Sequence, residues 1–171
     1  MSTVQYALNL GLLVYILASN LGTRRLSPAR LVVPVVLVAV AGWFFLRGIP
    51  TRGHDVQLEI IGLAAGAGLG VLAGLLVRVR RTPAGDLHTQ AGAAYALLWM
   101  VVIGGRVAFA YGAEHWFARS IGRFSMAHQI TGADAWTAAF VLMALTMVLA
   151  RVLVTSARVR LVAPPAQVVV A

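Results

Sequence analysis

The residues of this chain that could do chemistry are histidines and carboxylates near the ends of apolar segments. Five of them fall in segments expected on one side of a membrane: His54, Asp55, Glu114, His115 and His128. Imidazole and carboxylate groups are suitable ligands for a divalent metal such as zinc. Their spacing matches no metal motif, because neither His-x-x-x-His nor His-Glu-x-x-His occurs. We interpret the set either as ordinary loop polarity or as an outer-face polar or metal cluster, and we leave the metal unassigned.

Two further charges lie about one helical turn inside apolar segments. Glu59 follows the start of one segment, and Arg106 precedes the end of the next. Consecutive helices joined by a short connection are usually antiparallel neighbours, which would place both charges at a similar depth. Because an unpaired charge near lipid is costly, we expect an intramembrane ion pair between Glu59 and Arg106. Separate snorkelling of each side chain to the headgroups is the alternative.

Small residues indicate where helices approach one another closely. Gly62, Gly66, Gly70 and Gly74 recur every fourth residue, as in a glycine zipper, and lie on one helical face. Such a stripe lets helix backbones pack in a membrane, either within the chain or in a homodimer. A pore lining is a third interpretation. The pair at positions 104–105 could likewise permit a bend or a close contact.

The composition indicates that a membrane protein carries these residues. The 171-residue chain is 60% apolar and 11% charged, and its mean hydropathy is +0.86. Soluble domains are about 45–50% apolar and about 25% charged. Five apolar segments approach or reach the length needed to cross a bilayer: residues 4–19, 31–46, 56–77, 91–110 and 135–155. We therefore expect an all-α fold, a polytopic transmembrane helical bundle of five spans. Residues 1–161 would form one domain and residues 162–171 a flexible C-terminal tail.

The arginines indicate the orientation of the spans. Three clusters follow the first, third and fifth segments: Arg24, Arg25 and Arg30; Arg78, Arg80 and Arg81; Arg158 and Arg160. The alternate connections carry fewer. Because cytoplasmic loops are enriched in positive residues, this pattern predicts the N-terminus outside and the C-terminus inside.

The connection between the fourth and fifth segments has an amphipathic pattern. Phe117, Ile121 and Phe124 recur at helical spacing, while Arg119 and Arg123 fall on another face. This pattern is typical of a short helix that lies in the membrane interface. We expect such a helix within residues 111–132.

Several function classes find no support in the sequence. The chain has no cysteine, which excludes disulfide and thiolate chemistry. No histidine lies in the middle of a segment for haem ligation, and no nucleotide-binding or nucleophile motif occurs. The net charge of +9 comes entirely from arginines beside apolar segments, which is typical of topogenic signals and not of nucleic-acid binding. We expect no cofactor and no enzymatic activity. The Arg-only, Ala- and Gly-rich composition favours a bacterial origin.

The order of features resembles the CcdC-like family of small bacterial membrane proteins. The likeness lies in residues 44–50, which read Phe-Phe-Leu-Arg-Gly-Ile-Pro, in Leu58-Glu59 at the start of a glycine-rich segment, and in residues 106–109, which read Arg-Val-Ala-Phe. The resemblance covers residues 31–155. It implies a multi-pass protein of the bacterial plasma membrane and an association with cytochrome c maturation loci, without an assigned activity. The long outer connection with histidines departs from the family.

Three functions agree with these features. The first is a scaffold or accessory subunit without a catalytic site, which packs on a membrane partner or on its own copies in the lipid bilayer. The second is a small oligomeric transporter or permeation unit. The third is an outer-face protein that binds a metal or a small ligand. The absence of catalytic motifs and the glycine stripe favour the first.

Overall fold

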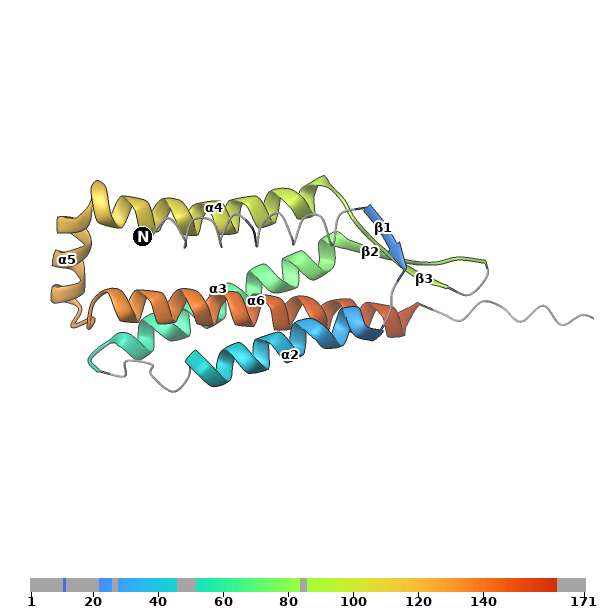
Figure 1. Ribbon diagram of the computed structural model, residues 1–171, viewed down its shortest axis with the longest axis horizontal. Helices are drawn as coiled ribbons and strands as arrows, with labels where there is room; N and C mark the ends of the chain where they lie inside the picture. Colours follow the sequence, from blue (N-terminus) through green and yellow to red (C-terminus); the bar gives the residue numbers. More distant parts are fainter. Residues whose placement is uncertain (1–10, 12–21, 26–27, 46–51, 84–85, 163–171) are drawn as a thin grey trace, which may run out of the picture.

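A computed structural model describes residues 11, 22–25, 28–45, 52–83 and 86–162 (Figure 1). This part of the chain is mostly helical. Its elements follow one another in this order: β1 (Gly22–Arg25), α2 (Pro28–Phe45), α3 (Asp55–Leu76), β2 (Val77–Arg81), β3 (Leu87–Ala91), α4 (Ala93–His115), α5 (Ala118–Ala127) and α6 (Ala133–Leu161).

Three helices, α3, α4 and α6, are long and apolar enough to cross a membrane. They have 22, 23 and 29 residues, and about 20 helical residues span the hydrocarbon core. Helix α2 has 18 residues and corresponds to the second expected span. The first expected span, residues 4–19, lies outside the described residues except for Gly11, as does the expected tail beyond Val162.

Helices α3 and α6 run side by side in the same direction and form the closest pair of the bundle. The glycine stripe of α3 makes this approach feasible. A Cβ atom added at Gly62 would lie 2.5 Å from the carbonyl oxygen of Ala139, and one at Gly74 would lie 2.7 Å from Cβ of Val154. Gly66 and Gly70 meet the backbone of α6 in the same way, at Met143 and Met147. The stripe therefore packs within the chain.

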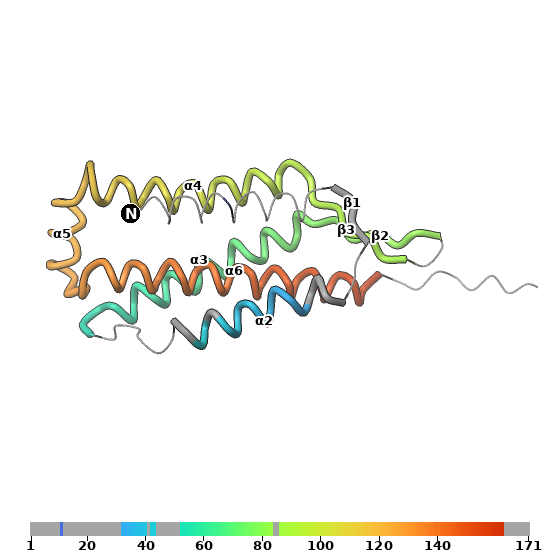
Figure 2. Tube along the Cα trace, viewed as in Figure 1, coloured from blue at the N-terminus to red at the C-terminus, as the bar shows by residue number. Residues whose placement is uncertain are grey.

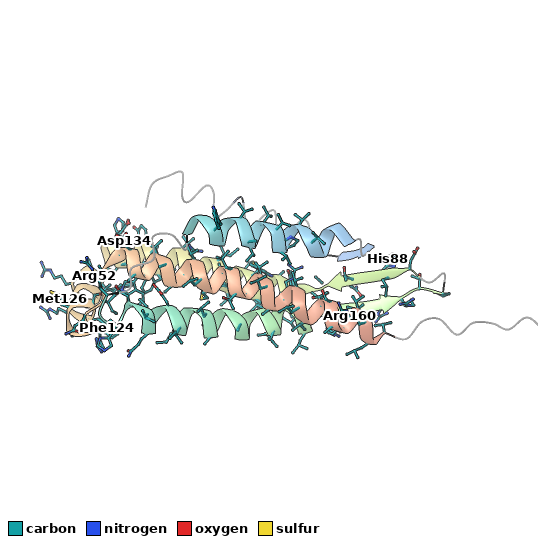
Figure 3. The ribbon with its side chains drawn as sticks, turned by 90° about the horizontal axis from the view of Figure 1, so that it is seen from below. Arg52, His88, Phe124, Met126, Asp134 and Arg160 are labelled. Carbon is teal, nitrogen blue, oxygen red and sulfur yellow. The ribbon has the colours of Figure 1, made fainter. Side chains whose placement is uncertain are left out.

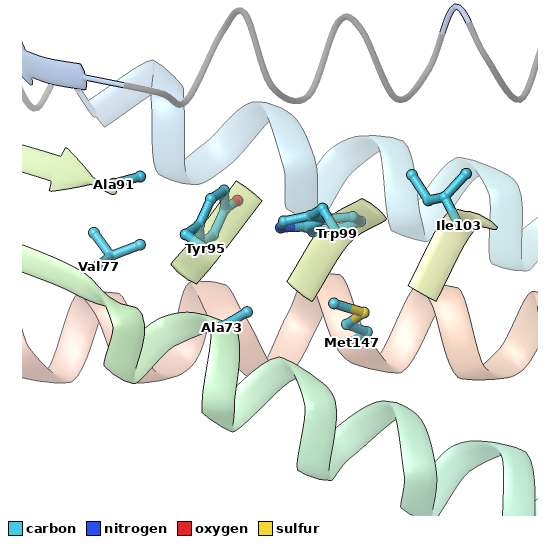
Figure 4. Close-up of a cluster of buried hydrophobic side chains, with 7 residues drawn as sticks. All are labelled: Ala73, Val77, Ala91, Tyr95, Trp99, Ile103 and Met147. Carbon is cyan, nitrogen blue, oxygen red and sulfur yellow. The ribbon is translucent and has the colours of Figure 1, made fainter. Parts of the chain in front are cut away.

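Helix α4 runs antiparallel to this pair and is held away from it by large side chains. Tyr95, Trp99 and Ile103 of α4 lie in one buried row that faces Ala73 and Met147 (Figure 4). Because the spacing of four residues puts all three on one helical face, α4 contributes its bulky side and α3 its smallest residues. The core is thus built from side chains on α4 and from backbone contact between α3 and α6.

The expectation of an all-α chain is wrong at one end of the bundle. Strands β1, β3 and β2 form an antiparallel sheet with β3 in the centre. In the register of the sheet, Ala91 pairs with both Gly22 and Val77, and His88 pairs with both Arg25 and Arg80. Two segments expected to be plain arginine-rich loops therefore contain strands, whose backbone groups pair with one another across the sheet. The alternation of valine and arginine over residues 77–80 was the available signal.

The opposite end of the bundle is closed by α5, which crosses the ends of the long helices (Figure 2). The helix expected between the fourth and fifth spans is therefore present. It is shorter than residues 111–132, because α4 continues unbroken to His115. Figure 3 shows Arg52, Phe124 and Asp134 at this end, and His88 and Arg160 at the other.

Candidate functional site

The end of the bundle that carries α5 holds a buried carboxylate. The Asp55 side chain, at the first residue of α3, is 0% exposed. It accepts a hydrogen bond of 2.8 Å from the backbone N–H of Thr131 and a second from the Thr131 hydroxyl. Both donors come from the connection between α5 and α6, so Asp55 fastens the start of α3 to the start of α6.

The backbone next to Asp55 strengthens this connection. The amide of His54 donates to the carbonyl of Gln129 at 3.3 Å. Gly53 adopts a positive φ of 55°, and a Cβ atom there would collide with the same carbonyl oxygen. Gly53 therefore serves a close backbone approach that a larger residue would prevent.

The three histidines expected in an outer cluster are each held by a backbone carbonyl. Nδ1 of His54 donates to the carbonyl of His128 at 2.9 Å. Nδ1 of His115 donates to Tyr111 at 3.0 Å, and Nδ1 of His128 donates to Phe124 at 2.9 Å. His115 and His128 also stack on the rings of those residues, with centroids 4.1 Å apart in both pairs. Two of the three side chains are thus turned back onto their own helices.

The expected metal cluster is not assembled. Within the described ranges, no group of three or more histidine, aspartate or glutamate residues could hold a metal ion. Asp55 is engaged with Thr131, and the exposed Glu114 and His115 lie on α4. The residues share one end of the bundle but do not converge on one point.

Glu59 and Arg106 are placed with different neighbours. Glu59, one turn after Asp55, lies on the face of α3 that continues into the glycine stripe, and it is 8% exposed. Its Oε1 atom has no hydrogen-bond partner among the described residues. The guanidinium of Arg106 lies over the ring of Phe140 on α6, with Cζ 5.8 Å from the ring centroid. The structure thus does not bring the two side chains into the expected ion pair.

The reason lies in the arrangement of the helices. The expectation required α3 and α4 to be the closest neighbours, as consecutive helices usually are. Because glycines let α6 approach α3 more closely, the face that carries Glu59 is turned toward α6. The Arg106 guanidinium instead lies over the ring of Phe140. The face of an aromatic ring carries partial negative charge and attracts a cation.

An aromatic cluster joins α4, α5 and α6 at this end. Phe109 is its centre, with ring centroids 5.2 Å from Phe140, 5.3 Å from Trp136 and 6.2 Å from Phe117. Trp136 also donates from Nε1 to the hydroxyl of the buried Ser125 at 3.2 Å. Phe117 and Phe124 were expected on the apolar face of α5, but the role of Phe109 could not be read from periodicity alone.

Arg158 has a structural role that the sequence did not reveal. Its Nη1 atom donates to the carbonyls of Gly74, Leu75 and Val77, at 3.2, 2.9 and 2.5 Å. Gly74 and Leu75 lie in the last turn of α3, where helix geometry leaves carbonyls without partners and where the helix dipole favours a cation. Val77 follows directly as the first residue of β2. Arg158 therefore fastens α6 to the far end of α3, as Asp55 does at the near end.

The outward face of α4 has features that suit contact with another helix. It presents an apolar row with a notch of small residues: Leu97, Met100, Val101, Gly104, Gly105 and Ala108. Leu97 and Val101 are 58% and 62% exposed. A Cβ atom added at Gly104 or Gly105 would have no described residue within 4 Å. Gly104 and Ala108 are spaced as in the small-xxx-small pattern of membrane helix contacts.

Comparisons with known proteins assign no family to this arrangement. No protein-family model matches the chain, and a match is found neither to a curated protein nor to a solved structure.

Proposed function

We propose that this protein is a multi-pass protein of the bacterial plasma membrane. It would act without catalysis, as a scaffold or accessory subunit that packs on a membrane partner through the outward face of α4. The observation that carries the proposal is the open notch of Gly104 and Gly105 within an exposed apolar row. Apolar side chains suit lipid equally well, but a notch of small residues lets a second helix approach closely.

Five spans with the N-terminus outside and the C-terminus inside agree with the distribution of charge. Strands β1 and β2, the start of α2 and the end of α6 carry the arginine clusters, and all lie at the sheet end. Cytoplasmic segments are enriched in arginine, so the sheet end would face the cytoplasm and α5 would lie in the outer interface. Reporter fusions at the two termini test this orientation. Activity of both reporters in the same compartment would contradict it.

The permeation and metal-binding alternatives have weaker support. A pore around the glycine stripe would need that face to be open, whereas α6 covers it. A metal protein would need converging ligands, and the histidines at the α5 end are held by backbone carbonyls. The scaffold interpretation needs neither feature.

Site-specific photo-crosslinking tests the proposed contact. The chain has no cysteine, so a benzophenone can be attached to a single introduced thiol. Val101→Cys on α4 should give one adduct of discrete mass in native membranes. The matched control Leu72→Cys, which is exposed on α3, should give none. An adduct of twice the chain mass would identify the partner as a second copy.

A further variant separates a packed partner from nearby lipid or passing proteins. Gly104→Leu in the Val101→Cys background should abolish the adduct, because the added side chain fills the notch. The melting temperature should stay unchanged, since the position is open. Equal labelling from Val101→Cys and Leu72→Cys, or an adduct that survives Gly104→Leu, would contradict the proposal.

A further inference from the structure

The hairpin of β2 and β3 has two different faces. Successive side chains of a strand point to opposite sides, and residues that pair across an antiparallel ladder share a side. Val77 and Ala91 pair with each other, and both belong to the buried core cluster. One face of the hairpin therefore packs against the bundle, and the opposite face is turned away from it.

The face that is turned away carries two arginines. Arg78 and Arg80 lie on it, paired with Gln90 and His88 of β3. Arg78, Arg80 and Gln90 are exposed, whereas His88 is half-buried. Neither arginine makes a hydrogen bond or an ion pair with another described residue. We call Arg78, Arg80 and Gln90 the arginine face; its two cations are about 7 Å apart along the strand.

Carboxylates are scarce around the arginine face. Strands β2 and β3 and the last turns of α6 contain none, and α6 ends with Arg158 and Arg160. In the described ranges, Asp86 in the connection between the two strands is the one acid nearby. The carboxylates of α3, α4 and α6 all lie toward the α5 end. The surface thus has a positive potential that is complementary to an anion.

The depth of the arginine face follows from α3. Strand β2 begins at the residue after α3 ends. The 22 residues of α3 span about 33 Å, and the hydrocarbon core of a bilayer is about 30 Å thick. Where α3 crosses a membrane, β2 therefore begins close to the hydrocarbon boundary. The hairpin continues along the long axis of the bundle (Figure 1, Figure 3), so Arg78 and Arg80 lie within roughly 15 Å of that boundary.

This depth is that of the lipid headgroups. Because the arginine face is turned away from the helices, the phosphates of neighbouring lipids are the anions that it meets first. A guanidinium binds phosphate through charge-assisted hydrogen bonds. Basic segments that directly follow a transmembrane helix attract anionic lipids.

We propose that the arginine face binds the headgroups of anionic phospholipids. The contact is a surface of the hairpin and needs no cavity between the helices. Bound lipid would hold the sheet, and with it the ends of α3 and α4, at the membrane surface. The inference rests on the proposed location in a membrane, but it does not require the N-terminus to be outside.

The lipid composition beside the hairpin tests the proposal. The chain has no cysteine, so Gln90→Cys places a single fluorophore directly across the ladder from Arg78. The full-length protein is inserted into phosphatidylcholine nanodiscs that contain a small fraction of lipid with a nitroxide quencher near the top of its acyl chain. This lipid is either phosphatidylglycerol or phosphatidylcholine. At equal mole fraction, phosphatidylglycerol should quench several-fold more strongly, because it is enriched at the arginine face.

A double variant shows whether the arginines cause this preference. Arg78→Gln combined with Arg80→Gln should weaken the affinity for phosphatidylglycerol by about fivefold for each arginine removed. Both positions are exposed, so the melting temperature should stay unchanged. The matched control combines Arg119→Gln with Arg123→Gln, which removes two exposed arginines of α5 at the other end. It should leave the preference intact.

Several results would overturn the proposal. Equal quenching by the two lipids would do so, as would equal losses in the two double variants. Absence of quenching by either lipid would place the hairpin away from the headgroups. Loss of the preference in millimolar inorganic phosphate would indicate a free phosphate ion as the ligand. Membrane fractionation is scored separately: if the protein stays with membranes while the two lipids quench equally, only this inference fails.

Discussion

Glycines of α3 and α4 occupy opposite environments in the same bundle. Gly62, Gly66 and Gly70 of α3 are buried against the backbone of α6, and none has room for a Cβ atom. Gly104 and Gly105 of α4 are exposed, with open space around each. The comparison shows that a glycine pattern indicates close packing without indicating the partner. In α3 the partner is helix α6 of the same chain, whereas no described residue packs against Gly104 or Gly105 of α4.

The two helices also differ in how they are fixed. The pair of α3 and α6 is joined by hydrogen bonds at both ends, through Asp55 to Thr131 and through Arg158 to the carbonyls of Gly74 and Leu75. Helix α4 is held mainly by side-chain packing of Tyr95, Trp99 and Ile103. The α3–α6 pair is therefore joined at both of its ends, whereas α4 is held by packing on one face and exposes its other face among the described residues.

The largest loss of stability is expected when a bulky side chain is placed between α3 and α6. Gly66→Leu should destabilise the protein by more than about 3 kcal/mol, because the new side chain would meet the backbone of Met143 and force the helices apart. The matched control Gly68→Leu lies two residues away in open space and should change stability by less than about 0.5 kcal/mol. Thermal unfolding followed by circular dichroism in detergent measures both. Equal effects of the two variants would contradict the tight packing of α3 on α6.

A smaller loss of stability is expected when the hydrogen bonds at the start of α3 are removed. Asp55→Ala removes both hydrogen bonds to Thr131 and should cost about 2 kcal/mol, as is usual for buried hydrogen bonds to a charged group. The control Asp134→Ala alters an exposed acid in the first turn of α6 and should cost about 0.5 kcal/mol. Unfolding in denaturant compares the two variants. A loss no greater than that of the control would show that Asp55 does not fasten α3.

The smallest change in stability is expected for a substitution at Glu59. Because one of its carboxyl oxygens is buried without a partner, Glu59→Gln should leave stability unchanged or raise it by about 1 kcal/mol. Arg106→Gln provides the matched variant, since Arg106 lies over Phe140. A double-mutant cycle should show no coupling between the two positions. A coupling energy above about 1 kcal/mol would show that Glu59 and Arg106 form the ion pair after all, and that α4 packs more closely on α3.

Much of the fold was predictable because hydrophobicity and helix periodicity are local properties. The runs that became α3, α4 and α6 were recognisable from length and composition, and the helix α5 from the spacing of Phe117, Ile121 and Phe124. The strands were missed because five-residue segments beside a long apolar helix give a weak signal. Pairing with a distant strand, as between Gly22 and Ala91, is invisible to a local pattern.

The sequence by itself determined that the chain forms long apolar helices and that its arginines and carboxylates are segregated along it, since each property depends only on residue type and spacing. Tertiary structure alone decided which helix covers the glycines of α3, why Glu59 and Arg106 have separate neighbours, and where Tyr95 meets Arg151. These outcomes depend on which surfaces fit most closely, and complementarity between distant segments exists only once the helices are assembled.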